Sequence, residues 1–174
     1  MRRALALFPA VLTLLGCVGV PEGLQPVEGF DLSRYLGRWY EVARLDHSFE
    51  RGLSRVTAEY SLRPDGGVRV LNQGYALEKG TWKRAEGKAF FVHEHARAHL
   101  KVSFFGPFYG SYVVVDLDRE HYQWALVAGP SRSYLWILSR TPALDPEVQR
   151  TLVAKAKTLG FETDRLILVD QGTP

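Results

Sequence analysis

The chain has 174 residues, 46% of them hydrophobic, which is enough for one domain with its own core. Its formal net charge is +3 at pH 7, and it falls to +1 when Arg2 and Arg3 are left out. No basic block is interleaved with aromatic residues, so the composition argues against a nucleic-acid-binding protein. Cys17 is the only cysteine, which excludes an intrachain disulfide.

The start of the chain has the pattern of a bacterial export leader. Two arginines precede an apolar run over residues 4–15, which is too short to span a bilayer as a helix. Leu14-Leu15-Gly16-Cys17 is typical of a lipobox, although an ordinary signal peptide with a chance cysteine is the alternative. The sequence therefore predicts a signal peptide over residues 1–16 and acylation at Cys17. Val18 in place of an aspartate favours sorting to the outer membrane, as in bacterial lipoproteins.

The segment after Cys17 predicts a spacer. Residues 18–28 contain two prolines and two glycines, so residues 17–29 are interpreted as the lipidated cysteine and an extended tether. The folded domain is expected over residues 30–174. A short turn of helix at 30–36 opens it, with Asp31 or Ser33 as the capping residue.

Eight strand-like segments follow at regular spacing, and each shows partial alternation of apolar and polar residues. Pro64-Asp65-Gly66-Gly67 is a strong hairpin signal between the second and third. The strands are predicted at residues 38–46, 54–63, 68–76, 80–89 with a continuation to 92, 98–104, 110–117, 121–128 and 133–140.

A single longer helix is predicted after the strands. Asp145 and Pro146 begin it, apolar residues recur at helical spacing, and Gly160 ends it. Its apolar face needs a surface to pack on, which the outside of a barrel would provide. A short ninth strand follows at 165–169. Eight meandering strands and then a helix favour an all-β, eight-stranded antiparallel up-and-down barrel, whose interior is wide enough for one small ligand.

Three short motifs could close one end of this barrel. Gly37 and Trp39 stand at the start of the first strand, and Arg140 stands at the end of the eighth. An arginine laid across an indole contributes about 1 kcal/mol. Asp116 and Asp118, around the end of the sixth strand, are expected on the loop beside this floor.

The set of motifs resembles the lipocalin family, and together with the leader it is similar to the bacterial outer-membrane lipoprotein lipocalins. The resemblance covers about residues 30–169 and includes the segments 49–53, 102–110 and 134–142. Val115-Asp116-Leu117-Asp118 departs from the Thr-Asp-Tyr that the family often has in the second motif. Gly37, Trp39, Asp116 and Arg140 are therefore interpreted as a structural motif outside the ligand site.

Strand alternation selects the side chains that face into the barrel. Leu62, Val68 and Val102 share those faces, and the resemblance supports the inward placement of Tyr60, Asn72, Tyr112 and Trp136. The predicted ligand-binding residues are Ala58, Tyr60, Val70, Asn72, Phe104, Tyr112, Val114, Trp136 and Leu138. The opposing interpretation is that these rings simply fill the barrel.

Two polar features stand apart from the apolar walls. Glu41 shares the parity of Trp39, so its carboxylate is expected inside the barrel near the floor, where it needs an arginine or tyrosine partner or must be neutral. His93, His95 and His99 have metal-like composition, but their segment is better explained as a solvated turn. No metal and no cofactor is predicted. The aromatic residues around Gly106-Pro107 form either a cap on the core or an apolar rim that touches a membrane or partner.

The resemblance implies a lipid-anchored carrier on the periplasmic face of the outer membrane. Its ligands would be fatty acids or lysophospholipids, with a role in lipid storage or transport and in membrane repair under stress, and no bond chemistry. Some relatives dimerise, so a homodimer is compatible with it. The alternatives are a barrel enzyme using Glu41, Tyr60 or Asn72, a haem or pigment carrier with His93 or His99 as axial ligand, and a partner-binding lipoprotein with a filled barrel.

Overall fold

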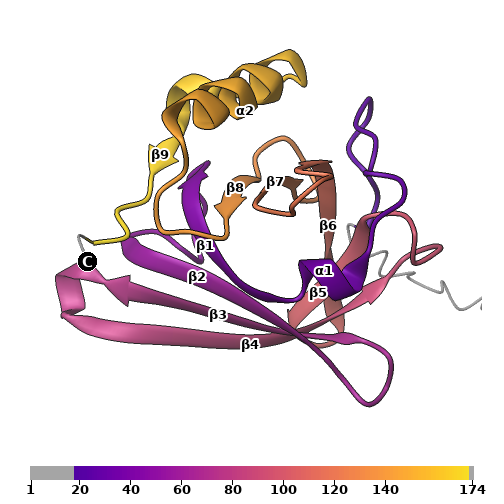
Figure 1. Cartoon of the computed structure of the whole chain (residues 1–174). Helices are drawn as coiled ribbons and strands as arrows, with labels where there is room; N and C mark the ends of the chain where they lie inside the picture. Colours follow the sequence, from indigo (N-terminus) through magenta and orange to yellow (C-terminus); the bar gives the residue numbers. More distant parts are fainter. Residues whose placement is uncertain (1–17, 173–174) are drawn as a thin grey trace, which may run out of the picture.

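The structure is a computed structural model, and it describes residues 18–172. Nine strands and two α-helices make up the fold (Figure 1). The strands are β1 Gly37–Arg44, β2 Leu53–Leu62, β3 Val68–Ala76, β4 Thr81–Phe91, β5 His99–Phe105, β6 Phe108–Leu117, β7 Trp124–Ala128, β8 Leu135–Ser139 and β9 Ile167–Leu168. The helices are α1 Leu32–Tyr35 and α2 Pro146–Thr158, with 3₁₀ turns at Leu77–Lys79 and Thr163–Arg165.

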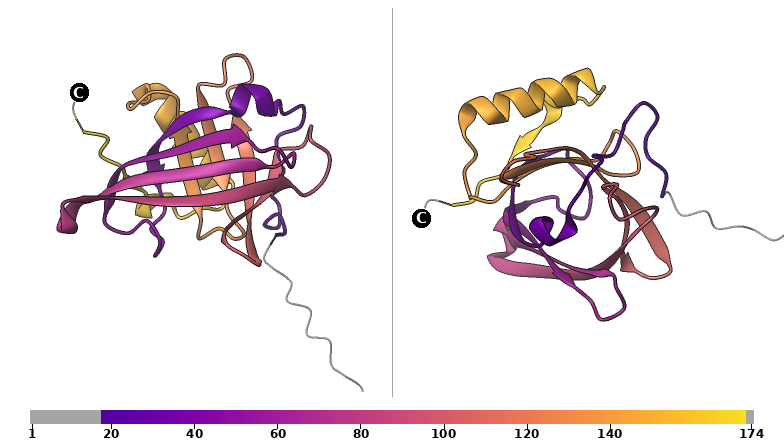
Figure 2. Two further views of the ribbon diagram at one scale, coloured as in Figure 1. Left: turned by 90° about the horizontal axis from the view of Figure 1, so that it is seen from below. Right: turned by 45° about the vertical axis from the view of Figure 1, so that its right-hand side comes forward.

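The predicted closed barrel is confirmed. Strands β2 to β8 form an antiparallel meander, and β1 pairs with both β8 and β2, which closes the sheet on itself (Figure 2). The pairing of β1 with β2 ends at Tyr40, and beyond it β9 lies against Ala43 and Arg44 of β1. Where β1 and β2 separate, the ninth strand pairs with the edge of β1.

Several strands are shorter or longer than expected, for local reasons. β7 begins at Trp124 rather than at residue 121, because the carboxylate of Asp118 accepts bonds from the backbone N–H groups of Glu120, His121 and Gln123. These bonds hold the preceding residues in a compact loop. β6 begins at Phe108, two residues early, because pairing with β5 continues almost to the turn.

Helix α2 packs against the outside of the barrel, as the sequence predicts. The Asp145 carboxylate caps its first turn by accepting from the N–H groups of Glu147 and Val148. Leu152 and Ala156 are buried in an outer core that includes the outward side chains of the neighbouring strands. Within residues 18–172, no helix is long and apolar enough to cross a membrane.

The segment before α1 is packed on the barrel rather than hanging free as a spacer. Leu24 and Val27 are buried. The backbone N–H of Val27 donates to the carbonyl of Val114 at 2.9 Å, and the N–H of Ala98 donates to the carbonyl of Val27 at 2.9 Å. The predicted signal peptide and Cys17 lie outside the described residues.

Candidate functional site

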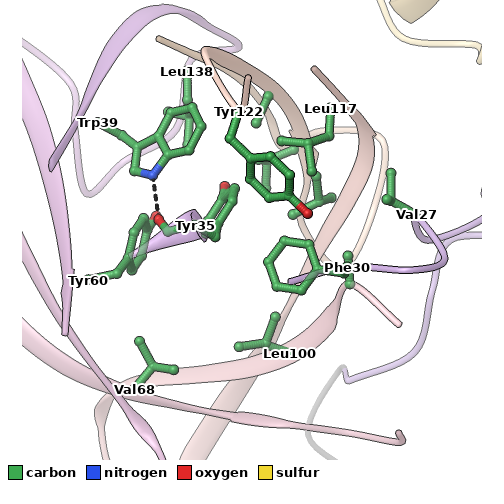
Figure 3. Close-up of a cluster of buried hydrophobic side chains, with 14 of the residues drawn as sticks. Val27, Phe30, Tyr35, Trp39, Tyr60, Val68, Leu100, Leu117, Tyr122 and Leu138 are labelled. Carbon is green, nitrogen blue, oxygen red and sulfur yellow. Dashed lines mark hydrogen bonds between the residues drawn. The ribbon is translucent and has the colours of Figure 1, made fainter. Parts of the chain in front are cut away.

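One end of the barrel is sealed by the predicted pair of Trp39 and Arg140. Trp39 is fully buried, and its indole N–H donates to the carbonyl of Tyr35 at 2.8 Å (Figure 3). The Arg140 guanidinium lies 3.9 Å from the centre of the indole ring and donates to the carbonyls of Arg34 and Arg38. Helix α1 lies over this end, where Asp31 rather than Ser33 is the cap. We refer to this end as the floor.

Gly37 has a defined role in the floor. Its φ of +92° is a conformation that favours glycine, and a Cβ there would lie 3.5 Å from the Arg140 guanidinium. Asp116 does not lie on the loop beside the floor. It belongs to β6, and its carboxylate faces outward and pairs with Lys155 of α2 at 2.7 Å. Asp118, in contrast, does order the loop that follows.

Above the floor, the barrel encloses a cavity of about 100 Å³ with an opening at the other end, the mouth. Eight of the nine predicted ligand-binding residues line it: Ala58, Tyr60, Val70, Asn72, Phe104, Tyr112, Trp136 and Leu138. Most of these walls are apolar, which suits a hydrocarbon ligand.

Two predictions for the inner wall differ from the structure. Val114 faces inward as predicted, but it is fully buried in the inner core and does not line the cavity. Leu62 is 63% exposed, because it is the last residue of β2 and lies where the strand has left the barrel wall for the β2–β3 hairpin. Strand parity gives the direction of a side chain but not the depth at which the core is filled.

Three tyrosine hydroxyls meet at the inner end of the cavity. The hydroxyl of Tyr112 lies 2.7 Å from that of Tyr35 and 2.9 Å from that of Tyr60. Burial raises the pKa of all three phenols, so each remains a protonated donor near neutral pH. Three hydroxyl protons serve two mutual hydrogen bonds, which leaves one for another acceptor. The cavity therefore has a polar point deep among apolar walls.

A buried charged cluster lies on the mouth side of the cavity. Glu41 faces inward as expected, but it lies toward the mouth rather than near the floor, because its partner Arg44 is at the mouth end of β1. Its carboxylate accepts from Arg44 at 2.7 Å, and both side chains are almost fully buried. The Glu50 carboxylate accepts from the indole N–H of Trp136 at 3.1 Å and lies 2.9 Å from the Nε2 of His47. Arg44 also donates to the carbonyls of Glu50 and Leu53, which fixes the β1–β2 loop.

The pKa values of the Glu41 and Glu50 carboxyl groups are shifted in opposite directions. Burial and the neighbouring Glu50 carboxylate raise the pKa of Glu41 well above its usual value, against the opposing effect of Arg44. The pKa of Glu50 is lowered: burial acts to raise it, but the His47, Trp136 and Arg44 contacts together outweigh that effect. The Glu50 carboxylate then balances the charge of Arg44, while Glu41 is the group that takes up a proton.

The sequence did not single out Glu50 or Tyr35 as parts of the site. Tyr35 lies on the short helix over the floor and Glu50 lies in a loop, and neither element has the alternation that selects inward residues. Glu50 does fall in the segment 49–53 for which a resemblance was noted. The resemblance in that segment could have pointed to Glu50, but nothing in the sequence indicated its partners.

The histidines do not form a site in the cavity. His93 and His95 are exposed on the β4–β5 turn, as expected, but His99 is the first residue of β5 and is 2% exposed. Its ring points outward and bonds the Ser111 hydroxyl at 2.8 Å. In residues 18–172, no group of three or more metal-ligating side chains converges. No histidine is among the residues that line the cavity.

A closed antiparallel barrel with a sealed floor, an apolar cavity and an external helix defines the class of small hydrophobic ligand carriers. Residues 30–171 match the family model of the lipocalin-like domain, and the chain belongs to the lipocalin family. Insecticyanin from the tobacco hornworm Manduca sexta shares the fold, with a TM-score of 0.69 and 21% identity over 87% of this chain and 86% of its own.

Bacterial and plant relatives are more similar to this chain. The outer membrane lipoprotein Blc of Vibrio cholerae is 59% identical, over 97% of this chain and 99% of its own length. Blc of Escherichia coli is 57% identical over 87% of this chain and 85% of its own. Temperature-induced lipocalin-1 of Arabidopsis thaliana is 38% identical, over 82% and 80% of the two chains.

Proposed function

We propose that this lipocalin is an outer-membrane-anchored carrier of single-chain amphiphiles, and that lysophospholipids are its preferred ligands. The observation that carries the proposal is the cavity itself, which is lined almost entirely by apolar side chains and opens at one end. Removing an acyl chain from water into such walls contributes about 0.8 kcal/mol per methylene. The ligand partitions reversibly into the cup, and no bond chemistry is involved.

The charges along the cavity favour lysophospholipids over free fatty acids. Glu41 and Glu50 line the cavity, and no lysine or arginine does. A fatty-acid carboxylate near the ionised Glu50 would meet like charge in a region of low dielectric, which costs free energy. A zwitterionic or neutral head group avoids that repulsion. Fatty acids remain ligands only where their carboxylate stays outside the mouth.

The proposed location rests on the leader and on the relatives. Cys17 ends a lipobox-like segment, and the two Blc relatives are named outer membrane lipoproteins. An acylated Cys17 would hold the barrel at the periplasmic face of that membrane, since two or more acyl chains give stable anchoring. A carrier in this position could collect lysophospholipids released during membrane damage, which is the role in membrane maintenance that we propose.

A matched titration tests the ligand preference. The natively purified protein is titrated with palmitoyl lysophosphatidylethanolamine and with palmitate, and intrinsic tryptophan fluorescence is followed, because Trp136 lines the cavity. We expect saturable binding of both, with at least about a tenfold lower Kd for the lysophospholipid, a difference of about 1.4 kcal/mol. Equal affinity would remove the head-group preference, and no saturable response to either would remove the function.

Two neighbouring substitutions provide the control for the binding site. Val70 lines the cavity, whereas Leu71 is the next residue on β3 and points to the other face. Val70→Phe should fill the cavity and weaken lysophospholipid binding at least about tenfold, whereas Leu71→Phe should leave it unchanged. A similar loss in both variants would show that the ligand binds elsewhere.

A further inference from the structure

The exposed apolar side chains of the barrel gather at its mouth. Within residues 18–172, eight large hydrophobic side chains are exposed, and five of them lie on or beside the loops at the mouth. We call these five the open rim: Phe49, Leu77, Trp82, Phe105 and Phe108. Each is more than half exposed, and Phe105 reaches 82%. Soluble proteins rarely leave such a group of apolar side chains in water without a partner.

Two of the three segments that carry the open rim are basic. Residues 77–84, which form the β3–β4 turn and the start of β4, contain three basic residues and one acidic residue, and residues 101–109 contain Lys101 and no acidic residue. The third segment, residues 45–52 around Phe49, contains Asp46, Glu50 and Arg51. The β3–β4 hairpin projects beyond the other connections of the barrel (Figure 2, left). Trp82 packs against Tyr75 near its tip, with ring centres 5.6 Å apart. Tryptophan and lysine together are typical of segments that lie at a membrane–water interface.

The course of the N-terminal segment favours a lipid bilayer as the partner of the open rim. The backbone of Val18 lies beside the ring of His99 on β5, and the chain from Leu24 onward is packed on the barrel. The described part of the chain therefore begins on the barrel wall, at the residue that follows Cys17 in the sequence. Phe105 ends the same strand, six residues beyond His99, a distance of about 20 Å. Acyl chains on Cys17 would bring the bilayer within reach of this hairpin.

We propose that the open rim is a second membrane contact, which inserts into an anionic bilayer surface and turns the mouth toward the lipids. The inference rests on the acylation of Cys17 proposed above. In this arrangement the acyl anchor holds the protein at the bilayer, and insertion of the rim sets the direction of the mouth. Ligands then pass between the leaflet and the cavity without crossing bulk water.

Site-specific labelling tests this orientation. Acylation consumes the only cysteine of the chain, so one introduced cysteine can be labelled alone. Full-length acylated Phe105→Cys and Leu77→Cys variants carry an environment-sensitive fluorophore and are reconstituted in phosphatidylethanolamine–phosphatidylglycerol vesicles. Leu62→Cys is the matched control, because Leu62 is 63% exposed but lies at the floor end of β2. Mass spectrometry first verifies the acyl chains on Cys17.

We expect lipid-attached quenchers to reach the labels at 105 and 77 but not at 62. We also expect access of aqueous iodide to fall at least about threefold at the two rim positions when vesicles are added. Equal iodide access at all three positions overturns the proposal. Protection at 105 without lipid quenching, together with energy transfer between copies, overturns it in favour of a second copy of the chain. An unacylated Cys17 overturns it as well.

A transfer measurement separates this inference from the carrier function. Phe105→Ser with Phe108→Ser should slow delivery of a fluorescent lysophospholipid to vesicles about tenfold, whereas its Kd in solution should not change. Leu62→Ser should affect neither. If the rim variant transfers lipid normally, the rim proposal fails and the carrier stands. If lysophospholipid binds neither the unsubstituted protein nor the variants, the proposed carrier function is wrong, and the rim proposal that rests on it is wrong as well.

Discussion

The two ends of the barrel are built on opposite principles. At the floor, Trp39 is fully buried, and its polar atom and the Arg140 guanidinium find backbone carbonyls as partners. At the mouth, Phe49 and Phe105 are exposed, and a charged cluster lies buried just inside. The floor therefore contributes stability, whereas the mouth keeps apolar surface available for a ligand or a membrane. A substitution should reveal to which end its residue belongs.

Trp39→Ala should have the largest effect on stability. It leaves a cavity in the floor and removes the surface on which Arg140 lies, so the free energy of unfolding should fall by about 3–5 kcal/mol. Trp82→Ala, at the exposed tip of the β3–β4 hairpin, should change it by less than about 0.5 kcal/mol. Urea unfolding of both variants checks this. Equal losses would show that the two ends do not differ as described.

Glu50→Gln should have the next largest effect. It removes the charge that faces His47 and balances Arg44 in a buried position, at a cost of about 1–3 kcal/mol. Glu147→Gln on α2 breaks an exposed pair with Arg150 and should cost less than about 0.5 kcal/mol. The same unfolding measurement applies. An effect of Glu50→Gln no larger than that of Glu147→Gln would contradict a buried role.

Tyr112→Phe should have a smaller effect. The change removes the central hydroxyl of the tyrosine group and both of its hydrogen bonds but keeps the ring, so we expect a loss of about 0.5–1.5 kcal/mol. Tyr75→Phe is the control, since the Tyr75 hydroxyl makes no hydrogen bond among the described residues. Thermal unfolding compares the two. A neutral Tyr112→Phe would mean that the hydroxyls do not stabilise the inner end of the cavity.

The pH dependence of the free energy of unfolding should be the smallest effect, but its direction differs between the two glutamates. The pKa of Glu41 is raised on folding, so its ionisation opposes the fold, and its contribution to stability falls as pH rises from about 4.5 through the folded pKa. The pKa of Glu50 is lowered, so its contribution is present above about 4.5 and is lost as pH falls below that value. Glu41→Gln should flatten the first limb only.

Carbon NMR of the carboxyl groups measures these two titrations directly. We expect one resonance to titrate above the normal glutamate range and to disappear in Glu41→Gln, and one to titrate below it and to disappear in Glu50→Gln. Two normal titrations would show that the cluster does not divide its protons as described.

The sequence by itself determined the barrel, its floor and most of its inner wall. Alternation along the strands fixes which side chains face inward, and the structure agrees with it. Gly37 and Trp39 at the start of the first strand and Arg140 at the end of the eighth were recognised as motifs, and in the closed barrel Trp39 and Arg140 meet as those motifs predict. The outward helix follows in the same way from its apolar stripe, with Leu152 and Ala156 buried against the barrel.

Only the tertiary structure decided how deep the cavity is and which polar groups enter it. Val114 has the right parity, but Val27, from a segment that the sequence presents as a spacer, packs beside it. Asp116 pairs with Lys155 on a helix 39 positions away, and Glu50 enters from a loop without periodicity. Such contacts join residues far apart in the chain, and no local pattern encodes them, because they depend on how the closed barrel brings its surfaces together.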